Sequence, residues 1–242
     1  MQSIKLTARV AGILYLIVIV CGIFAEKYVR IRLVDFNDGA QTIINISQNE
    51  LLYRLGFVSD LLMQSAYFLL PVLLYRILKK ANKWLAQIMV LCVSVAVAIM
   101  CINMLNHYAP LLLINSEGFN SVQIQNQVLF YLTLHSHGYH IAQIFFGIWL
   151  LPLGYLTFKS GLFPKFIGVF LMIGCLGYLT AFGIYFIFPE KSEVLSSYLT
   201  IPADIGEFSL CLYLLIIGVK KVPNNNCERL AADSTEYLHQ NN

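Results

Sequence analysis

His137 and His140 have the residue type and the spacing that come closest to a metal site in this sequence. Side chains three positions apart lie on one face of a helix, and two such imidazoles can share a metal when Asp60 or Glu207 completes the shell. A metal-bound water could then attack a lipid headgroup or a peptide bond. The alternative is that these histidines only hydrogen-bond at a water interface. We favour this alternative and expect no cofactor, because the pattern lacks the context of HExxH and His135 projects to the opposite face.

A larger set of polar residues recurs on single faces of long apolar segments. When each segment is projected at about 100° per residue, small and polar residues form one stripe per helix, which suits close packing in lipid. The polar members of these stripes are Glu26, Arg30, Asp60, Gln64, Asn103, His107, His137, His140, Tyr178 and Glu207. Their positions along the segments put the ionisable members at a similar depth, in the outer third of a membrane. The sequence therefore predicts a polar chamber that opens outward.

Asp60 is the candidate from which we expect the largest consequences. An ionised carboxylate in a low dielectric needs a cation or several donors. The nearest candidates for Asp60 are Arg30 and the pair formed by His107 and His140. Asp60 and Glu207 can act as proton carriers or as interhelical locks. The lock is favoured, because buried charges are normally paired.

The composition requires a membrane. Hydrophobic residues make up 58% of the 242 residues and charged residues only 12%, against about 25% charged in a soluble domain. The mean hydropathy is +0.70. So few charges cannot cover a water-facing surface, and a net charge of +3 leaves no basic face for nucleic acid. The expected partner is therefore the lipid bilayer and not a nucleic acid.

Apolar runs of the length that a transmembrane helix needs, about 20 residues, recur along the chain. They are 8–25, 55–78, 84–105, 139–158, 166–188 and 199–219. Because the runs are continuous and do not alternate, strands are excluded. The sequence predicts an all-α, polytopic bundle of six transmembrane helices over residues 1–221 and a flexible cytoplasmic tail over 222–242. Short interfacial helices are expected on the outer side at 40–53, 121–134 and 196–203.

Basic residues are unequally divided between alternate connections of this six-span arrangement. One side holds Lys5, Arg9, Arg76, Lys79, Lys80, Lys83, Lys159, Lys165, Lys220, Lys221 and Arg229, and the other holds Lys27, Arg30, Arg32, Arg54 and Lys191. The positive-inside rule puts the first side, and with it both termini, in the cytoplasm. Cleavage after the first run is not expected, because no small-x-small site follows it.

Short motifs along the whole chain resemble one family. They are Phe24-Ala25-Glu26 with Tyr28-Val29-Arg30, the stretch from Tyr53-Arg54-Leu55-Gly56-Phe57 to Asp60-Leu61-Leu62, the stretch from Phe145-Phe146-Gly147 through Leu153-Gly154-Tyr155-Leu156 to Gly168, and Gly206-Glu207. The resemblance covers roughly residues 5–220 and is to a bacterial integral-membrane family known as domain of unknown function 4386. It implies a multi-pass protein of the bacterial plasma membrane. It brings no activity, substrate or catalytic residue, and His137 is not part of its pattern.

Three functions remain open from the sequence. In the first, the protein binds or moves a small or lipophilic ligand through the outward chamber. In the second, it is an intramembrane enzyme, metal-dependent or acid/base, that acts at the outer leaflet. In the third, it is an accessory subunit whose polar stripes pack against another membrane protein. We favour the first, because a bundle of this size can enclose a pocket and no catalytic motif is present.

Overall fold

The structure is a computed structural model that describes residues 2–116 and 121–220. Every regular element in these ranges is helical. In chain order they are α1 (Gln2–Ile23), the π-helix η1 (Phe24–Arg30), α2 (Ile31–Leu33), α3 (Gly39–Gln48), α4 (Glu50–Leu78), α5 (Lys83–Ile114), α6 (Ser121–Ile148), α7 (Leu150–Lys159), α8 (Lys165–Ile187), α9 (Pro189–Leu199) and α10 (Ile201–Ile216). The predicted all-α class is confirmed.

The described residues contain five segments that are long and apolar enough to cross a membrane. These are Ile4–Leu33, Glu50–Leu78, Lys83–Ile114, Val122–Lys159 and Lys165–Ile187. They extend over the first five predicted runs, most of them by several residues at one end. Their outward surfaces are apolar, as on α1, where Leu6, Ile13 and Val20 are each about half exposed or more. This pattern fits a lipid environment.

The sixth predicted span, 199–219, is not confirmed. The helix in this region, α10, has 16 residues, which at 1.5 Å per residue is about 24 Å, short of the ~30 Å of a bilayer core. Two residues set its length. Pro202 stands in the first turn, where its missing N–H costs nothing. At the other end Gly218 takes a left-handed backbone with φ of +80°, which stops the helix.

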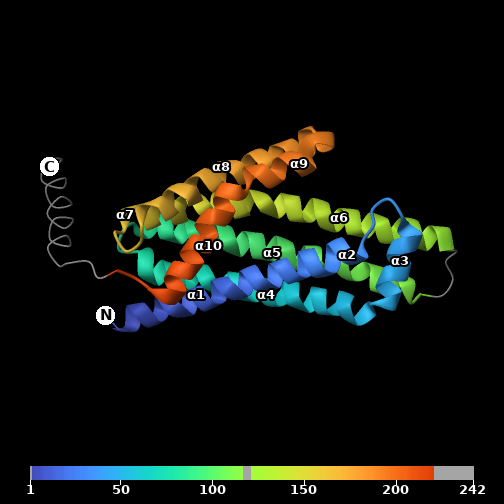
Figure 1. Cartoon of the computed structure of the whole chain (residues 1–242), viewed down its shortest axis with the longest axis horizontal. Helices are drawn as coiled ribbons and strands as arrows, with labels where there is room; N and C mark the ends of the chain where they lie inside the picture. Colours follow the sequence, from blue (N-terminus) through green and yellow to red (C-terminus); the bar gives the residue numbers. More distant parts are fainter. Residues whose placement is uncertain (1, 117–120, 221–242) are drawn as a thin grey trace, which may run out of the picture.

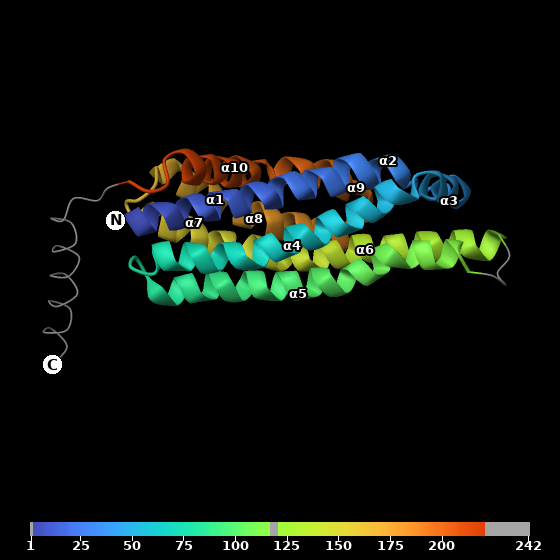
Figure 2. The same ribbon diagram turned by 90° about the horizontal axis from the view of Figure 1, so that it is seen from below.

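The six long helices close into a ring. Helix α1 packs against α4, α4 against α5, α5 against α6, α6 against α8, α8 against α10, and α10 against α1. The chain therefore returns to its start, and the two views show α10 lying across α1 near its N-terminal end (Figures 1 and 2). Residues that face the axis of this ring come from helices far apart in sequence.

Basic connections gather at one end of the ring, which we call the basic end. The N-terminus of α1, the α4–α5 turn with Lys79 and Lys80, the α7–α8 turn and the end of α10 all lie there, and α3 lies at the opposite end (Figure 1). An apolar core around Trp149, Tyr15 and Leu153 fills the half of the ring nearer the basic end. Glu26, Arg30, Asp60, Asn103 and His107 lie toward the other half, whereas Glu207 borders the core through Tyr15.

Helices α7 and α8 approach each other more closely than side chains allow. A Cβ on Gly168 would lie 2.6 Å from the carbonyl oxygen of Gly154, and a Cβ on Gly154 would lie 2.7 Å from that of Gly168. Paired glycines of this kind let helix backbones touch within a membrane. The contact fixes α8 against the core.

The outer connections differ in part from the predicted interfacial helices. The first, 40–53, is divided between α3 and the start of α4 by a break at Asn49. The second, 121–134, is continuous with the following span as α6, since nothing between Ser121 and Ile148 breaks the helix. The third, 196–203, is divided between α9 and α10 at Thr200. The break between α6 and α7 has a clear cause: Pro152 cannot donate to the carbonyl of Ile148.

Candidate functional site

Arg30 connects two carboxylates on neighbouring segments. Its Nε donates to Oε2 of Glu26 at 2.7 Å, and its Nη1 forms an ion pair with Oδ2 of Asp60. The Asp60 side chain is 2% exposed and that of Glu26 is 50% exposed. The group thus has a buried side at Asp60 and an accessible side at Glu26. Two carboxylates and one guanidinium give it a formal net charge of −1. Of the partners considered for Asp60, Arg30 and the pair of His107 and His140, Arg30 is the one that forms the ion pair.

The π-helix η1 is what carries Glu26 and Arg30. A π-helix has a wider turn than an α-helix and often occurs at functional sites. It changes the direction of the residues that follow, so a projection at 100° per residue does not describe this segment. The amide of Ile31 donates to the carbonyl of Glu26, five residues back, which closes the π-turn. No sequence signal for this helix was recognised.

A cluster of rings is formed by Tyr53 of α4, His107 of α5 and His135 of α6. The His107 ring stacks on Tyr53, with centroids 4.5 Å apart, and lies 5.1 Å from the His135 ring. The Tyr53 hydroxyl donates to the carbonyl of His107 at 2.6 Å. Neither ring nitrogen of His107 has a hydrogen-bond partner among the described residues.

Asn103 joins α5 to α6. Its Nδ2 donates to the carbonyl of His135 at 2.8 Å, and the Nδ1 of His135 lies 3.3 Å from the Asn103 carbonyl. Gly138 permits this approach, because a Cβ there would overlap the Asn103 side chain. His135 is 6% exposed, so the projection that put it on the opposite face was misleading. Helix α6 packs against both α5 and α8, and therefore it has two buried flanks.

Glu207 is the carboxylate at the centre of a second group. The Tyr15 hydroxyl donates to its Oε1 at 2.7 Å. Because Tyr15 belongs to α1, Glu207 lies at the contact between α10 and α1 that closes the ring. Its side chain is nevertheless only half-buried, and no ion pair with a lysine or arginine is found for it in the described part of the chain.

The histidines singled out for metal binding have contacts with other residues. His140 contacts Gln143, with 3.0 Å between Nδ1 and Oε1, and stacks on Tyr185 with centroids 3.5 Å apart. His137 is exposed, and its Nδ1 lies 2.8 Å from the carbonyl of Thr133. Over residues 2–116 and 121–220, no three or more His, Cys, Asp or Glu side chains form a group that could hold a metal ion. The suggested set of His137, His140, Asp60 and Glu207 is thus not assembled.

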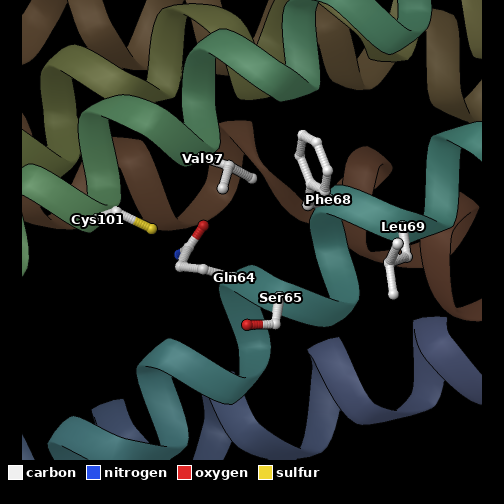
Figure 3. Close-up of a pocket in the computed structure, with 6 residues that line it drawn as sticks. All are labelled: Gln64, Ser65, Phe68, Leu69, Val97 and Cys101. Carbon is white, nitrogen blue, oxygen red and sulfur yellow. The ribbon is translucent and has the colours of Figure 1, made fainter.

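The ten candidates fall into separate groups. Glu26, Arg30 and Asp60 form the first, Glu207 is the centre of the second, and Asn103 and His107 are joined by their contacts with His135. Tyr178 packs against the apolar core. Tyr139 has its ring centroid 5.7 Å from that of His140. It is 39% exposed and was not among the candidates, although it directly precedes His140. Gln64 lies elsewhere, at a groove between α4 and α5 (Figure 3).

Residues 10–218 match the family described as Domain of unknown function (DUF4386). The chain belongs to this family. The match covers the ring of helices together with both polar groups, so the suspected relationship is confirmed. No curated protein and no solved structure matches this DUF4386 chain.

The arrangement in this DUF4386 protein suits binding by charge and aromatic faces. Three carboxyl groups, of Glu26, Asp60 and Glu207, stand against the single cation Arg30 among the groups just described. An aromatic side chain, Tyr15, is the hydrogen-bond partner of Glu207. Carboxylates attract cations, and aromatic faces attract them further through the ring quadrupole. Because the carboxyl groups outnumber the single arginine, these groups form a site of negative potential.

Proposed function

We propose that this DUF4386 chain is a membrane protein that binds a small ligand, with a positive charge and an apolar part, in a chamber inside the ring. The observation that carries the proposal is Glu207: a carboxylate of α10 that accepts a hydrogen bond from Tyr15 of α1, is only half-buried and has no ion pair with a lysine or arginine among the described residues. A carboxylate inside a bundle normally acquires a cation. The partial exposure of Glu207 leaves room for the cation to come from a ligand.

The end from which the ligand enters follows from where the apolar core lies. That core fills the half of the ring nearer the basic end, whereas Glu26 is half exposed in the other half. A ligand would therefore enter from the α3 end. Under the positive-inside rule this is the outer end. Binding is the function best supported, and no feature of the described residues favours an enzyme or an accessory subunit over it.

Substitution of Glu207 by glutamine tests the chamber. The probe is benzyltrimethylammonium, a small aromatic cation, and benzenesulfonate serves as an anion of similar size. We expect the cation to raise the melting temperature of the wild-type protein in a neutral detergent by several degrees at about 100 times its Kd. The anion should have no effect. Glu207→Gln should remove most of the shift yet fold normally, because the amide oxygen still accepts from Tyr15.

Glu50→Gln provides the matched control, since Glu50 pairs with Arg54 at the surface. This variant should keep the full response to the cation. Equal shifts from cation and anion, or an undiminished shift in Glu207→Gln, would contradict the proposal.

The orientation of the chain is a separate expectation. A single cysteine at Lys80, in the basic α4–α5 turn, and another at Asn37, between α2 and α3, report opposite ends of the ring. In a background without the six native cysteines, we expect an impermeant maleimide to label Asn37→Cys in intact cells and Lys80→Cys only after lysis. Labelling of both from the outside would overturn the proposed topology.

A further inference from the structure

A groove on the outer surface of the ring contains an unsatisfied amide. The α4–α5 groove is lined by Gln64, Ser65, Phe68, Leu69, Val97 and Cys101 and has a volume of about 320 Å³. Phe68 and Leu69 are about half exposed, whereas Gln64 is 1% exposed. Figure 3 shows the Gln64 side chain directed from α4 toward Val97 and Cys101 on α5. Gln64 thus forms the polar base of an otherwise apolar groove.

The Gln64 amide has no partner within the described residues. Both Oε1 and Nε2 are buried and unbonded. A buried unpaired amide is costly, by about 1–3 kcal/mol, and is therefore uncommon in native proteins. Ser65 cannot relieve it at no cost, because its hydroxyl donates to the carbonyl of Leu61 at 2.8 Å. A group from outside the chain that both donates and accepts would satisfy both atoms of this amide.

The position of the groove restricts what this group can be. Gln64 lies near the middle of α4, a helix that is long and apolar enough to span the membrane, so the groove opens into the lipid and not into water. The lining includes no charged side chain, which disfavours an ionised ligand at this depth. A hydroxyl is the neutral group that donates to the amide oxygen and accepts from the amide nitrogen. The volume lies at the lower end of the range for small-molecule sites.

We propose that the α4–α5 groove binds a neutral, hydroxyl-bearing lipid whose oxygen pairs with Gln64 and whose chain packs on Phe68, Leu69 and Val97. The site is separate from the chamber around Glu207, and the proposal does not depend on it. Two hydrogen bonds to one amide would remove the cost of the unpaired group. The occupant comes from the membrane itself.

Photolabelling in nanodiscs tests this proposal. The probes are a ten-carbon alcohol and the corresponding alkane, each with a diazirine on the chain, and cross-links are mapped by peptide mass spectrometry. We expect the alcohol to label α4 and α5 peptides that carry Ser65–Leu69 and Cys101, and the alkane to label lipid-facing surfaces evenly. Excess 1-decanol should compete with the alcohol, whereas decane should not.

Two variants separate the amide from its surroundings. Gln64→Leu should weaken competition by 1-decanol about tenfold, which corresponds to ~1.4 kcal/mol, whereas Ser65→Ala should compete like the wild type. Without added alcohol, Gln64→Leu should melt at the same or a higher temperature, since it removes an unpaired buried amide. Even labelling by both probes, unchanged competition in Gln64→Leu, or stronger competition by decanoate than by 1-decanol would overturn the proposal. Cross-linking to a second protein at this groove would do the same.

Discussion

Replacement of Arg30 by methionine should destabilise the protein by about 3–5 kcal/mol, because it leaves the buried Asp60 carboxylate without its cation. Asp60 is 2% exposed, and Arg30 is the cation with which it pairs. Removal of one partner of a buried pair costs far more than the pair itself contributes. Thermal unfolding in detergent, with the helical signal as readout, measures the effect.

Three further variants test whether the unpaired Asp60 carboxylate is the cause of this loss of stability. Arg54→Met removes a cation of the same kind whose partner Glu50 is 43% exposed, so it should cost less than ~1 kcal/mol. Asp60→Asn should be mild, since the amide still accepts a hydrogen bond from Arg30. The double variant Arg30→Met/Asp60→Leu should recover part of the loss, because no buried charge is left unpaired. If Arg30→Met and Arg54→Met were equally stable, the role of the Arg30–Asp60 pair as an interhelical lock would be refuted.

Substitution of Gly168 by alanine should have the second largest effect, a loss of about 1–3 kcal/mol. The added Cβ would lie 2.6 Å from the backbone oxygen of Gly154 and 2.9 Å from the backbone nitrogen of Phe158. Backbone atoms cannot rotate away as a side chain does, so α7 and α8 would have to separate. The melting temperature in detergent reports the change.

Gly183→Ala is the matched control on the same helix. Nothing lies within 4 Å of a Cβ at Gly183, and alanine is a better helix former than glycine by about 0.8–1 kcal/mol. We therefore expect this variant to be slightly more stable than the wild type. A similar loss for both substitutions would show that the α7–α8 contact is not the cause.

The fold was largely predictable, because long apolar runs need no knowledge of contacts. Five of the runs appear as membrane-length helices. The run that is not confirmed as a span, 199–219, has helix ends at Thr200 and Gly218 that depend on backbone conformation more than on hydropathy. A continuous apolar run hides such a break, because the apolar residues on both sides of it remain compatible with lipid.

The site was less accessible to sequence reasoning. The partner of Asp60 was predictable, since few cations lie near it at the same depth. The setting of Glu207 was not, because it depends on how α10 closes the ring against α1, and so on tertiary packing. His135 was missed for the same reason: a helix in a ring has more than one buried face, and a single projected stripe identifies only one of them.

The π-helix η1 is a place where the first membrane segment can change its length by one residue. A π-turn holds one residue more than an α-turn, so deletion of one residue between Glu26 and Arg30 would let an α-helix run through while the parts before and after it keep their directions. Arg30 would then still face Asp60, but Glu26 would no longer lie four residues before it. A one-residue gap at η1 in an alignment of this family would therefore mark relatives that keep the pair of Arg30 and Asp60 without the wide turn.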